Sequence, residues 1–591
     1  MAGAQKGVRA RGLPWWTGPV AAWAMFSLFA LAALGIPAVG LQGAAPRGPD
    51  DLLRMVEVRD WLGGQAWTDV GQYRLAPPDG APMHWSRLVD LPIAGIILLL
   101  DPLLGRAGAE AAALVAVPLL TALAVIISGA SIVRRLFDGT ALLFPASLFL
   151  AATPLVALQM TPMRIDHHGW QIACGLGAVA AALARRPVLG GAVAGMFMAL
   201  WLSIGIEGLP MAAALGGVLA VRTLQDDAKL APLIAYLAAL ASVSALLFTV
   251  TQPASAWRAD WCDAMAPAYF AAFGAAFLGS LGLLVFRKKG WPWRLATLGT
   301  AALMAIGTLI LIQPACAAGP FARLDPLVQS FWYDSIGEGR PLWDAKPTVW
   351  ISVAVQLVLG AVGYVLAIRQ TANRDWISLA ILFVAATFLG LVVMRASAFA
   401  AALAVPGTIY LLSRWMPRAA SIRPPLRLAA MFAVFAVLFP LTPMTVQGAV
   451  APPRKADVTS SASNLSCREP EIYANLPDLG AARILAPLDA GPAILYARPY
   501  SVLASNHHRA DAAIADTLRI FMGSDAEARA MIRRRGISHV LTCAGMKEVA
   551  SYAKYAPDGF AAQLTAGTVP PWLVEVPLRE GTPLKLWRVM P

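Results

Sequence analysis

Charged side chains are scarce in this chain. Asp, Glu, Lys and Arg make up 14% of its 591 residues, whereas hydrophobic residues make up 58%. The mean hydropathy of +0.62 excludes a soluble globular protein as a description of the whole chain. Many apolar runs reach the roughly 20 residues that cross a bilayer. The sequence therefore predicts a polytopic α-helical membrane protein, whose backbone is hydrogen-bonded within helices wherever it faces lipid.

Several other features are missing from the sequence. It shows no internal repeat and no low-complexity tract. The start, MAGAQKGVRARGLPWW, is basic and then apolar but lacks a small-residue cleavage site, so we expect residues 15–40 to form a retained span. The formal charge of +13 does not indicate nucleic-acid binding, because much of the Lys and Arg flanks apolar segments.

These flanking cations predict which side each loop occupies. Lys6, Arg9 and Arg11 place the N-terminus inside, and the clusters after later spans extend the pattern to a tail outside. The segment 91–105 is short and carries Asp101 between prolines, so we expect it to be re-entrant or interfacial. About thirteen crossings are predicted: 15–40, 109–133, 140–158, 170–184, 188–208, 210–222, 230–250, 268–286, 295–313, 349–368, 376–394, 396–412 and 428–447.

Two domains follow from this map. Residues 1–452 form the predicted transmembrane domain, with a large first outer loop at 42–90. In the tail, 453–591, short apolar runs such as RILAPL and HVLTC alternate with helix-like stretches such as DAAIADTLRIF. This pattern predicts a small α/β domain outside the membrane.

Only five cysteines are present. Cys262 and Cys316 fall in two predicted outer loops, Cys467 and Cys543 fall in the outer tail, and Cys174 is alone in a span. Because the outer side is oxidising, we expect disulfides 262–316 and 467–543. The alternative is four unpaired thiols.

Polar residues collect in the predicted outer loops. The stretch TPMRIDHHGW places Asp166 and His168 two residues apart at the start of a span. Such a pair holds a divalent cation or faces a phosphate, and a helix N-terminus favours anions. The alternative is a polar loop whose histidines make ordinary hydrogen bonds.

Further candidates are predicted on the same side. Asp50 and Asp51 begin a helix-like stretch of the first loop; the alternative for Asp50 is a helix N-cap, a role that needs only one Asp and does not exclude catalysis. Glu207 lies at a turn between two apolar spans, where an acidic group is costly; the alternative is a solvated turn. Arg395 lies in a nearly unbroken apolar stretch and suits a phosphate; the alternative is an Arg that snorkels to the membrane edge.

Three patches, in this order, resemble motifs of one family. DDLLRMVEVRDWL, followed by PPDGAPMHWSRLVDLP, is similar to a D-x-Y-x-H-x-R helix and a later G-x-P-x-H/Y segment. RIDHHGWQ is similar to a D-x-E or D-H-H-x-x-E motif, and VMRASAFAAALAVP to an M-x-R…P segment. With the outer C-terminal domain, the chain resembles the C-type glycosyltransferase superfamily, and within it the catalytic subunit of oligosaccharyltransferase.

The resemblance implies roles for the matched residues. Asp51, or alternatively Asp50, is the expected acceptor-side base or metal ligand. Asp166, with His168 in place of the second acidic residue, is expected to bind metal or orient the donor phosphate, and Arg395 to hold the lipid phosphate. The implied cofactor is a divalent cation, Mg²⁺ or Mn²⁺, with Asp51, Asp166 and His168 as its ligands.

The same patches add Arg59, His84 and His167 as substrate-binding residues, whereas Glu207 is predicted on its position alone. The W-W-D-Y-G signature of oligosaccharyltransferases is absent, and only Asp489 and Gly491 echo it. The resemblance therefore does not imply transfer to an Asn side chain.

The implied function is inverting sugar transfer from a polyprenyl-phosphate donor to a glycan, lipid or protein acceptor, on the outer face of the bacterial cytoplasmic membrane. A second reading is a transporter or flippase of envelope glycolipids, although such proteins carry ionisable groups near mid-membrane and internal repeats. A third is a structural partner in an envelope-assembly complex, with His507 and His508 in a binding surface.

Overall fold

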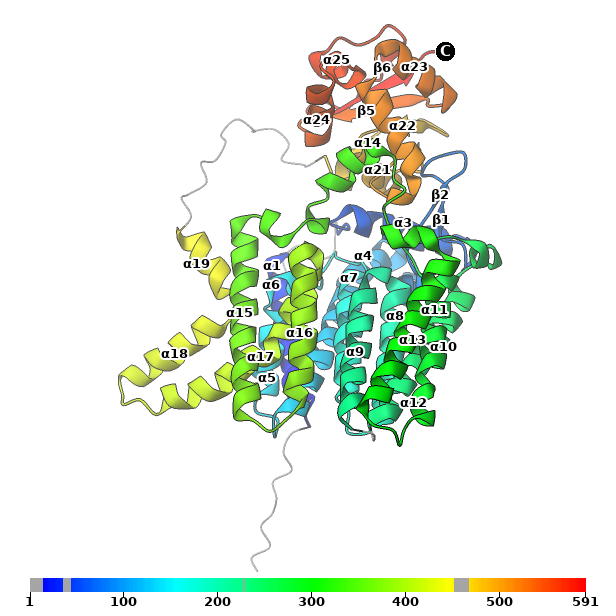
Figure 1. Ribbon diagram of the computed structural model, residues 1–591. Helices are drawn as coiled ribbons and strands as arrows, with labels where there is room; N and C mark the ends of the chain where they lie inside the picture. Colours follow the sequence, from blue (N-terminus) through cyan, green and yellow to red (C-terminus); the bar gives the residue numbers. More distant parts are fainter. Residues whose placement is uncertain (1–13, 36–43, 227–228, 451–466) are drawn as a thin grey trace, which may run out of the picture.

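A computed structural model of the chain describes residues 14–35, 44–226, 229–450 and 467–591. Most of the chain forms a bundle of long helices, and a sheet-containing domain sits on one end of this bundle (Figure 1). The polytopic helical fold with a C-terminal α/β domain is therefore as the sequence predicts.

Nine helical stretches of the described residues are long and apolar enough to cross a membrane. Three of them combine two elements: η1 (Ile206–Gly208) with α9 (Leu209–Gln225), α11 (Pro267–Ser280) with α12 (Gly282–Val285), and η8 (Met394–Ala396) with α17 (Ser397–Ala420). The other six are α4 (Arg87–Leu136), α8 (Pro187–Ile204), α10 (Leu230–Thr251), α13 (Trp291–Ile312), α15 (Pro347–Gln370) and α16 (Asp375–Val392).

The remaining predicted crossings are helical but shorter or bent. They correspond to α1 (Thr17–Ala33), to α5 (Leu143–Ala151) with α6 (Pro154–Leu158), and to α7 (His168–Ala182). The predicted span 428–447 is not one straight helix, because α18 (Leu426–Leu438) and α19 (Thr442–Val450) meet at a bend of 95°. By length and apolar composition, the described residues thus contain nine candidate spans, or ten if the bent pair counts as one, whereas about thirteen were predicted.

The helix α4 is broken within its length. Gly105 has φ +69°, a left-handed conformation that suits glycine, and it separates the first part of α4 from the part that covers the predicted crossing 109–133. Leu98, Leu99 and Leu103 of the first part are strongly exposed. The segment 91–105 is therefore separate from the next helical stretch, as predicted, and the break between them lies at Gly105.

The C-terminal domain is built on a five-stranded sheet of order β4-β3-β5-β7-β6. The strands β3, β4 and β5 are parallel, whereas β7 and β6 are antiparallel to their neighbours. The short run AILYA, which the sequence pattern groups with RILAPL and HVLTC, is helical and lies in α21. The elements are α20 (Pro470–Ala474), β3 (Arg483–Leu485), α21 (Gly491–Ala497), β4 (Ser501–Val502), α22 (Asp511–Met522), α23 (Asp525–Arg534), β5 (His539–Cys543), α24 (Lys547–Tyr555), α25 (Phe560–Ala566), β6 (Leu573–Glu575) and β7 (Leu584–Val589).

The first loop shares a hydrophobic core with this domain. It contains α3 (Pro49–Leu62) and a two-stranded ribbon, β1 (Gly71–Gln72) and β2 (Ala81–Pro82). Leu52, Leu53 and Trp85 of the loop are buried in the same cluster as Ile484 and Val540 of the sheet. Packing against the domain therefore fixes the position of α3.

Both predicted disulfides are confirmed. Cys262 pairs with Cys316 and Cys467 with Cys543, while Cys174 is a buried free thiol in α7.

A buried cluster of charged side chains joins α3 to the start of α4. Arg54 and Arg87 both donate to the Asp90 carboxylate, over 2.8 and 3.2 Å. Glu57 is 2% exposed, and neither of its carboxylate oxygens has a hydrogen-bond partner among the described residues. Burial, followed by the nearby Asp90 carboxylate, raises the pKa of Glu57 to about 8.

Glu57→Gln is expected to stabilise the protein above neutral pH. In the wild type, Glu57 ionises near pH 4.5 when unfolded but near pH 8 when folded, so its contribution to folding stability falls as pH rises through that window. The neutral amide removes this pH dependence, with an expected gain of about 1–3 kcal/mol at pH 8. Thermal unfolding of the detergent-solubilised protein at pH 5 and pH 8 measures the effect.

Glu110→Gln is the matched control, because Glu110 holds Arg59 through two hydrogen bonds. That variant should lose stability at both pH values. A Glu57→Gln protein that unfolds earlier than the wild type at pH 8 would show that the Glu57 carboxylate is ionised and favourable.

Candidate active site

The N-terminus of α3 meets the loop that precedes α7. Asp51 accepts hydrogen bonds from the Gly48 amide (3.0 Å) and the Asp166 amide (2.9 Å), and Arg164 lies 3.4 Å from its second oxygen. The first contact lets Asp51, in the first turn of α3, satisfy the backbone amide of the N-cap residue Gly48. Asp51 thus joins two segments that are far apart in the sequence, and both of its oxygens are occupied.

Asp50 presents a different carboxylate. It makes no hydrogen bond or ion pair within the described parts of the chain, and it is half-buried. Burial, then the nearby carboxylates of Asp166 and Glu338, raises the pKa of Asp50 to about 7. Of the two adjacent acids, Asp50 is therefore the one available to a ligand, while Asp51 caps the helix.

Asp166 forms a compact cluster with the two histidines that follow it. Its oxygens lie 2.5 Å from Nδ1 of His167 and 2.5 Å from Nδ1 of His168, and the two imidazoles stack with centroids 4.3 Å apart. Burial opposes ionisation of Asp166, but the two imidazoles outweigh it and hold the pKa of this carboxyl well below its usual range. The sequence motif RIDHH is therefore one buried unit.

This unit has the donor set of a cation site. One ligand atom from each of Asp166, His167 and His168 lies within 4.8 Å of the others. Nε2 of His168 is buried and has no hydrogen-bond partner among the described residues. An orphaned imidazole nitrogen in a unit that also contains a carboxylate fits a divalent metal that accepts nitrogen and oxygen ligands. The charges of Asp166 and His168 also act on the Asp50 carboxylate, whereas Asp51 already accepts hydrogen bonds from two amides.

Arg395 and Glu207 meet in an apolar cavity beside this cluster. Nη2 of Arg395 lies 2.8 Å from Oε2 of Glu207. The cavity has a volume of about 370 Å³, and His168 also lines it. Most of the cavity wall is apolar, and its polar end carries one cation, Arg395, and one anion, Glu207. Its apolar lining includes Ile172, Trp201, Leu209, Leu309, Leu389, Val393 and Phe399.

Glu338 is a site residue that sequence reasoning missed. It lies in η6 (Gly337–Gly339), and its charge influences Asp50, His168 and Arg395. The amide of Met394 donates to the Arg340 carbonyl over 2.8 Å, which ties this segment to the turn that carries Arg395. The only sequence signal is an acid between two glycines in a predicted outer loop.

Two predicted substrate-binding residues lie elsewhere. Arg59 donates two hydrogen bonds to Glu110 and one to the Tyr496 carbonyl, so it fastens α3 to α4 and to the C-terminal domain. His84 belongs to a separate cluster with His507 and His508. The structure thus brings together Asp50, Asp51, Asp166, His167, His168, Glu207 and Arg395, but neither Arg59 nor His84.

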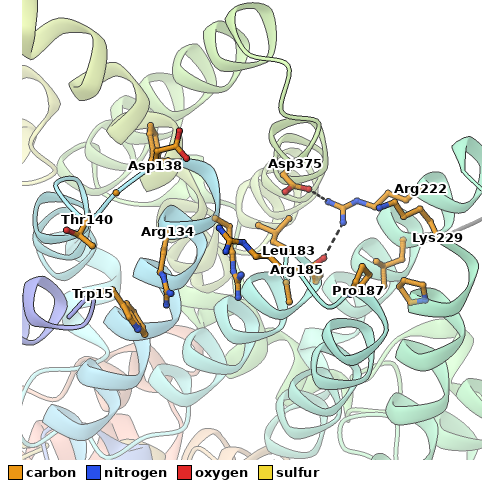
Figure 2. Close-up of a pocket in the computed structure, with 17 residues that line it drawn as sticks. Trp15, Arg134, Asp138, Thr140, Leu183, Arg185, Pro187, Arg222, Lys229 and Asp375 are labelled. Atoms are coloured by element: carbon orange, nitrogen blue, oxygen red, sulfur yellow. Dashed lines mark hydrogen bonds and ion pairs between the residues drawn. The ribbon is translucent and has the colours of Figure 1, made fainter. Parts of the chain in front are cut away.

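A second cavity, of about 540 Å³, lies at the other end of the bundle, where α4 ends and α8 begins (Figure 2). Arg134, Arg185, Arg222 and Lys229 line it, and Arg222 pairs with Asp375 over 2.7 Å. These cations lie at or just after the predicted inner ends of spans. They lie at the end of the bundle opposite the candidate site, and their sidedness stays a prediction.

Comparison with known proteins gives a match in fold only. No protein-family model matches the chain, and no curated protein is similar to it in sequence. The structure of the archaeal oligosaccharyltransferase AglB from Archaeoglobus fulgidus, in complex with an inhibitory peptide and a dolichol-phosphate, is similar with a TM-score of 0.67 and 13% identity, over 93% of this chain and 72% of that chain.

Two further structures of the A. fulgidus oligosaccharyltransferase are also similar. The complex with Zn and sulfate has a TM-score of 0.62 and 13% identity, over 92% of this chain and 70% of that chain. The complex with a tethered acceptor peptide that contains the NVT sequon has a TM-score of 0.64 and 12% identity, over 93% and 72%. The fold of this chain is therefore similar to that of the A. fulgidus oligosaccharyltransferase, as the sequence resemblance implies.

Proposed function

We propose that this protein is a membrane glycosyltransferase that transfers a sugar from a polyprenyl-phosphate-linked donor to an acceptor. The observation that carries the proposal is that His168 and Arg395 line the same apolar cavity, while Asp166 contacts His168 and lies near the Asp50 carboxylate. The cavity suits the lipid chain, and a guanidinium suits its phosphate. The fold shared with AglB supports this reading.

The residues then have separate roles in an inverting transfer. Asp50 orients an acceptor hydroxyl and takes its proton as the hydroxyl oxygen attacks the anomeric carbon. The bond between that carbon and the phosphate oxygen breaks on the opposite side, and Arg395 holds the departing phosphate. Glu207 positions Arg395 before the donor arrives. Asp51 positions Asp50 and Asp166 rather than reacting itself.

A divalent cation is part of the proposal. Asp166 and His168, together with Asp50, would hold it. When bound, such an ion neutralises negative charge that develops on the leaving phosphate. One structure of the A. fulgidus oligosaccharyltransferase contains Zn and sulfate, which supports metal binding in this fold.

We also propose which side of the membrane each part of the protein faces. The cations around the second cavity would face the cytoplasm, and the candidate site with the C-terminal domain would lie on the outer face of a bacterial cytoplasmic membrane. The acceptor there is a glycan, lipid or protein.

Asp166→Asn is expected to lower sugar transfer by about 10- to 100-fold, because an amide binds the cation and the two imidazoles more weakly. The experiment compares hydrolysis and transfer from a panel of polyprenyl-phosphate sugars by the wild type and the variant, with and without EDTA. EDTA should reduce the wild type to the level of the variant. The control is Asp138→Asn, an exposed acid beside the second cavity, which should keep full activity.

If Asp166→Asn in the presence of EDTA were as active as the untreated wild type, both the proposed cation and the proposed site would be overturned.

A further inference from the structure

A second histidine cluster lies outside the candidate active site. His84 follows β2 in the first loop, whereas His507 and His508 precede α22 in the C-terminal domain. The three ring centroids are 4.9, 4.7 and 5.3 Å apart. One ring nitrogen of each histidine lies within 4.8 Å of the others. Two distant parts of the chain thus bring three imidazoles to one point.

The spacing of the rings suits a shared ion. Zn²⁺ binds imidazole nitrogen at about 2.0–2.1 Å in tetrahedral geometry, which separates neighbouring ring centres by about 5 Å. Nδ1 of His84 is 2.9 Å from Nε2 of His507, so two nitrogens already point at each other. His507 is 3% exposed, and its other nitrogen, Nδ1, has no hydrogen-bond partner among the described residues.

The third imidazole is oriented by a carboxylate. Nε2 of His508 donates to Asp263 over 2.6 Å, which leaves Nδ1 with the lone pair that a metal needs. Arg509 holds the same carboxylate through two hydrogen bonds, of 2.8 and 2.9 Å. Asp263 itself follows Cys262, which is fixed by its disulfide to Cys316. A carboxylate behind a histidine is the usual support of a metal-binding imidazole.

Aromatic side chains enclose the cluster. Trp85 packs edge-on against His507 with centroids 5.6 Å apart, and Phe321 packs edge-on against His508 at 5.1 Å. The same Trp85 ring also lies 6.2 Å from the His167 ring, measured between centroids. The Trp85 ring therefore lies near both histidine groups, while Asp263 and Arg509 supply the polar contacts of the cluster.

We propose that His84, His507 and His508 bind a divalent transition-metal ion of the Zn²⁺ class, which clasps the first loop to the C-terminal domain. Three imidazoles select zinc-like ions over Mg²⁺ or Ca²⁺, which prefer oxygen ligands. Three protein ligands leave a fourth position for water. The ion holds the first loop, which carries Asp50, against the domain, so its role is structural and distinct from that of the cation proposed at Asp166.

The test counts zinc in the full-length, detergent-solubilised protein. The parent carries Asp166→Asn and His168→Gln, which remove the other candidate cation site. Metal is stripped with a chelator, Zn²⁺ is added back, free ion is removed by gel filtration, and the bound zinc is measured by mass spectrometry. The parent should retain one zinc ion per chain. Adding His84→Gln, His507→Gln or His508→Gln, each singly, should lower this content to a small fraction.

A second readout is the thermal midpoint. Zn²⁺ should raise it in the parent and leave it unchanged in the three variants. The control is His539→Gln, a buried histidine of β5 outside the cluster, which should keep the zinc and the shift. Gel-filtration profiles and intact disulfides verify folding. A parent without zinc, or variants that bind as much as the parent, would overturn the proposal and leave a hydrogen-bonded stack of imidazoles.

Discussion

Replacing Asp50 with Asn is expected to lower sugar transfer by about 10²- to 10⁴-fold, the loss typical of a general base. The carboxylate makes no hydrogen bond or ion pair within the described residues, and it lies beside the Asp166–His168 unit. An amide of the same shape fills its place but takes no proton from an acceptor hydroxyl. Donor binding should change little, because Arg395 holds the phosphate in the proposed mechanism. Single-turnover transfer and equilibrium donor binding measure the two effects separately.

Asp51→Asn is the matched control, since it changes the adjacent acid in the same way. Asp51 holds the Gly48 and Asp166 amides, so its variant should lose stability, by about 1 kcal/mol as for other helix caps. The folded fraction should keep more activity than Asp50→Asn does. An inactive Asp51→Asn of native stability, beside an active Asp50→Asn, would return the role of base to Asp51.

The second large effect is expected at Arg395. Arg395→Ala should lower kcat/KM for the lipid-linked donor by about 10²- to 10³-fold, because it removes a charge-assisted contact to phosphate in a low-dielectric cavity. Arg395→Lys should fall between the wild type and Arg395→Ala, since Lys keeps the charge but loses the planar fork. Initial rates at varied donor concentration distinguish the two variants.

Removal of a cation far from the site provides the control. Arg186 is exposed and precedes α8 at the end of the bundle opposite the cavity that Arg395 lines. The variant Arg186→Ala should therefore leave donor kinetics unchanged. If Arg395→Ala matched the wild type in kcat/KM, the cavity beside Glu207 would not be the donor site. A reduction of equal size in Arg186→Ala would mean that bulk charge, and not a phosphate contact, causes the effect.

Much of the fold could be predicted from local sequence. Apolar runs mark the helices because the bilayer requires them, and loop cations gather at one end, around Arg134 and Arg185. The disulfide partners followed from the same map. The number of crossings could not be read in this way, because helix length and the bend between α18 and α19 depend on tertiary packing.

Seven of the residues predicted for the site lie together in the structure, but Arg59 and His84 do not and Glu338 was not predicted. The roles of all these residues stay predictions. Which of Asp50 and Asp51 caps α3 depends on where the helix begins, at Gly48, and on the amide of Asp166, which is 115 residues away. Arg59 was misplaced because its partners lie in α4 and in the C-terminal domain. Contacts between distant segments decide these assignments, and no local pattern records them.

The shared core of α3 and the C-terminal domain has a consequence for biosynthesis. Leu52 and Leu53 are made long before Ile484 and Val540, against which they pack. Until the ribosome has made the sheet, this face of the helix that carries Asp50 lacks its partner, whereas the face with Met55 and Val58 can already pack against α4. The site is therefore expected to reach its final geometry only after the C-terminal domain has folded onto the first loop.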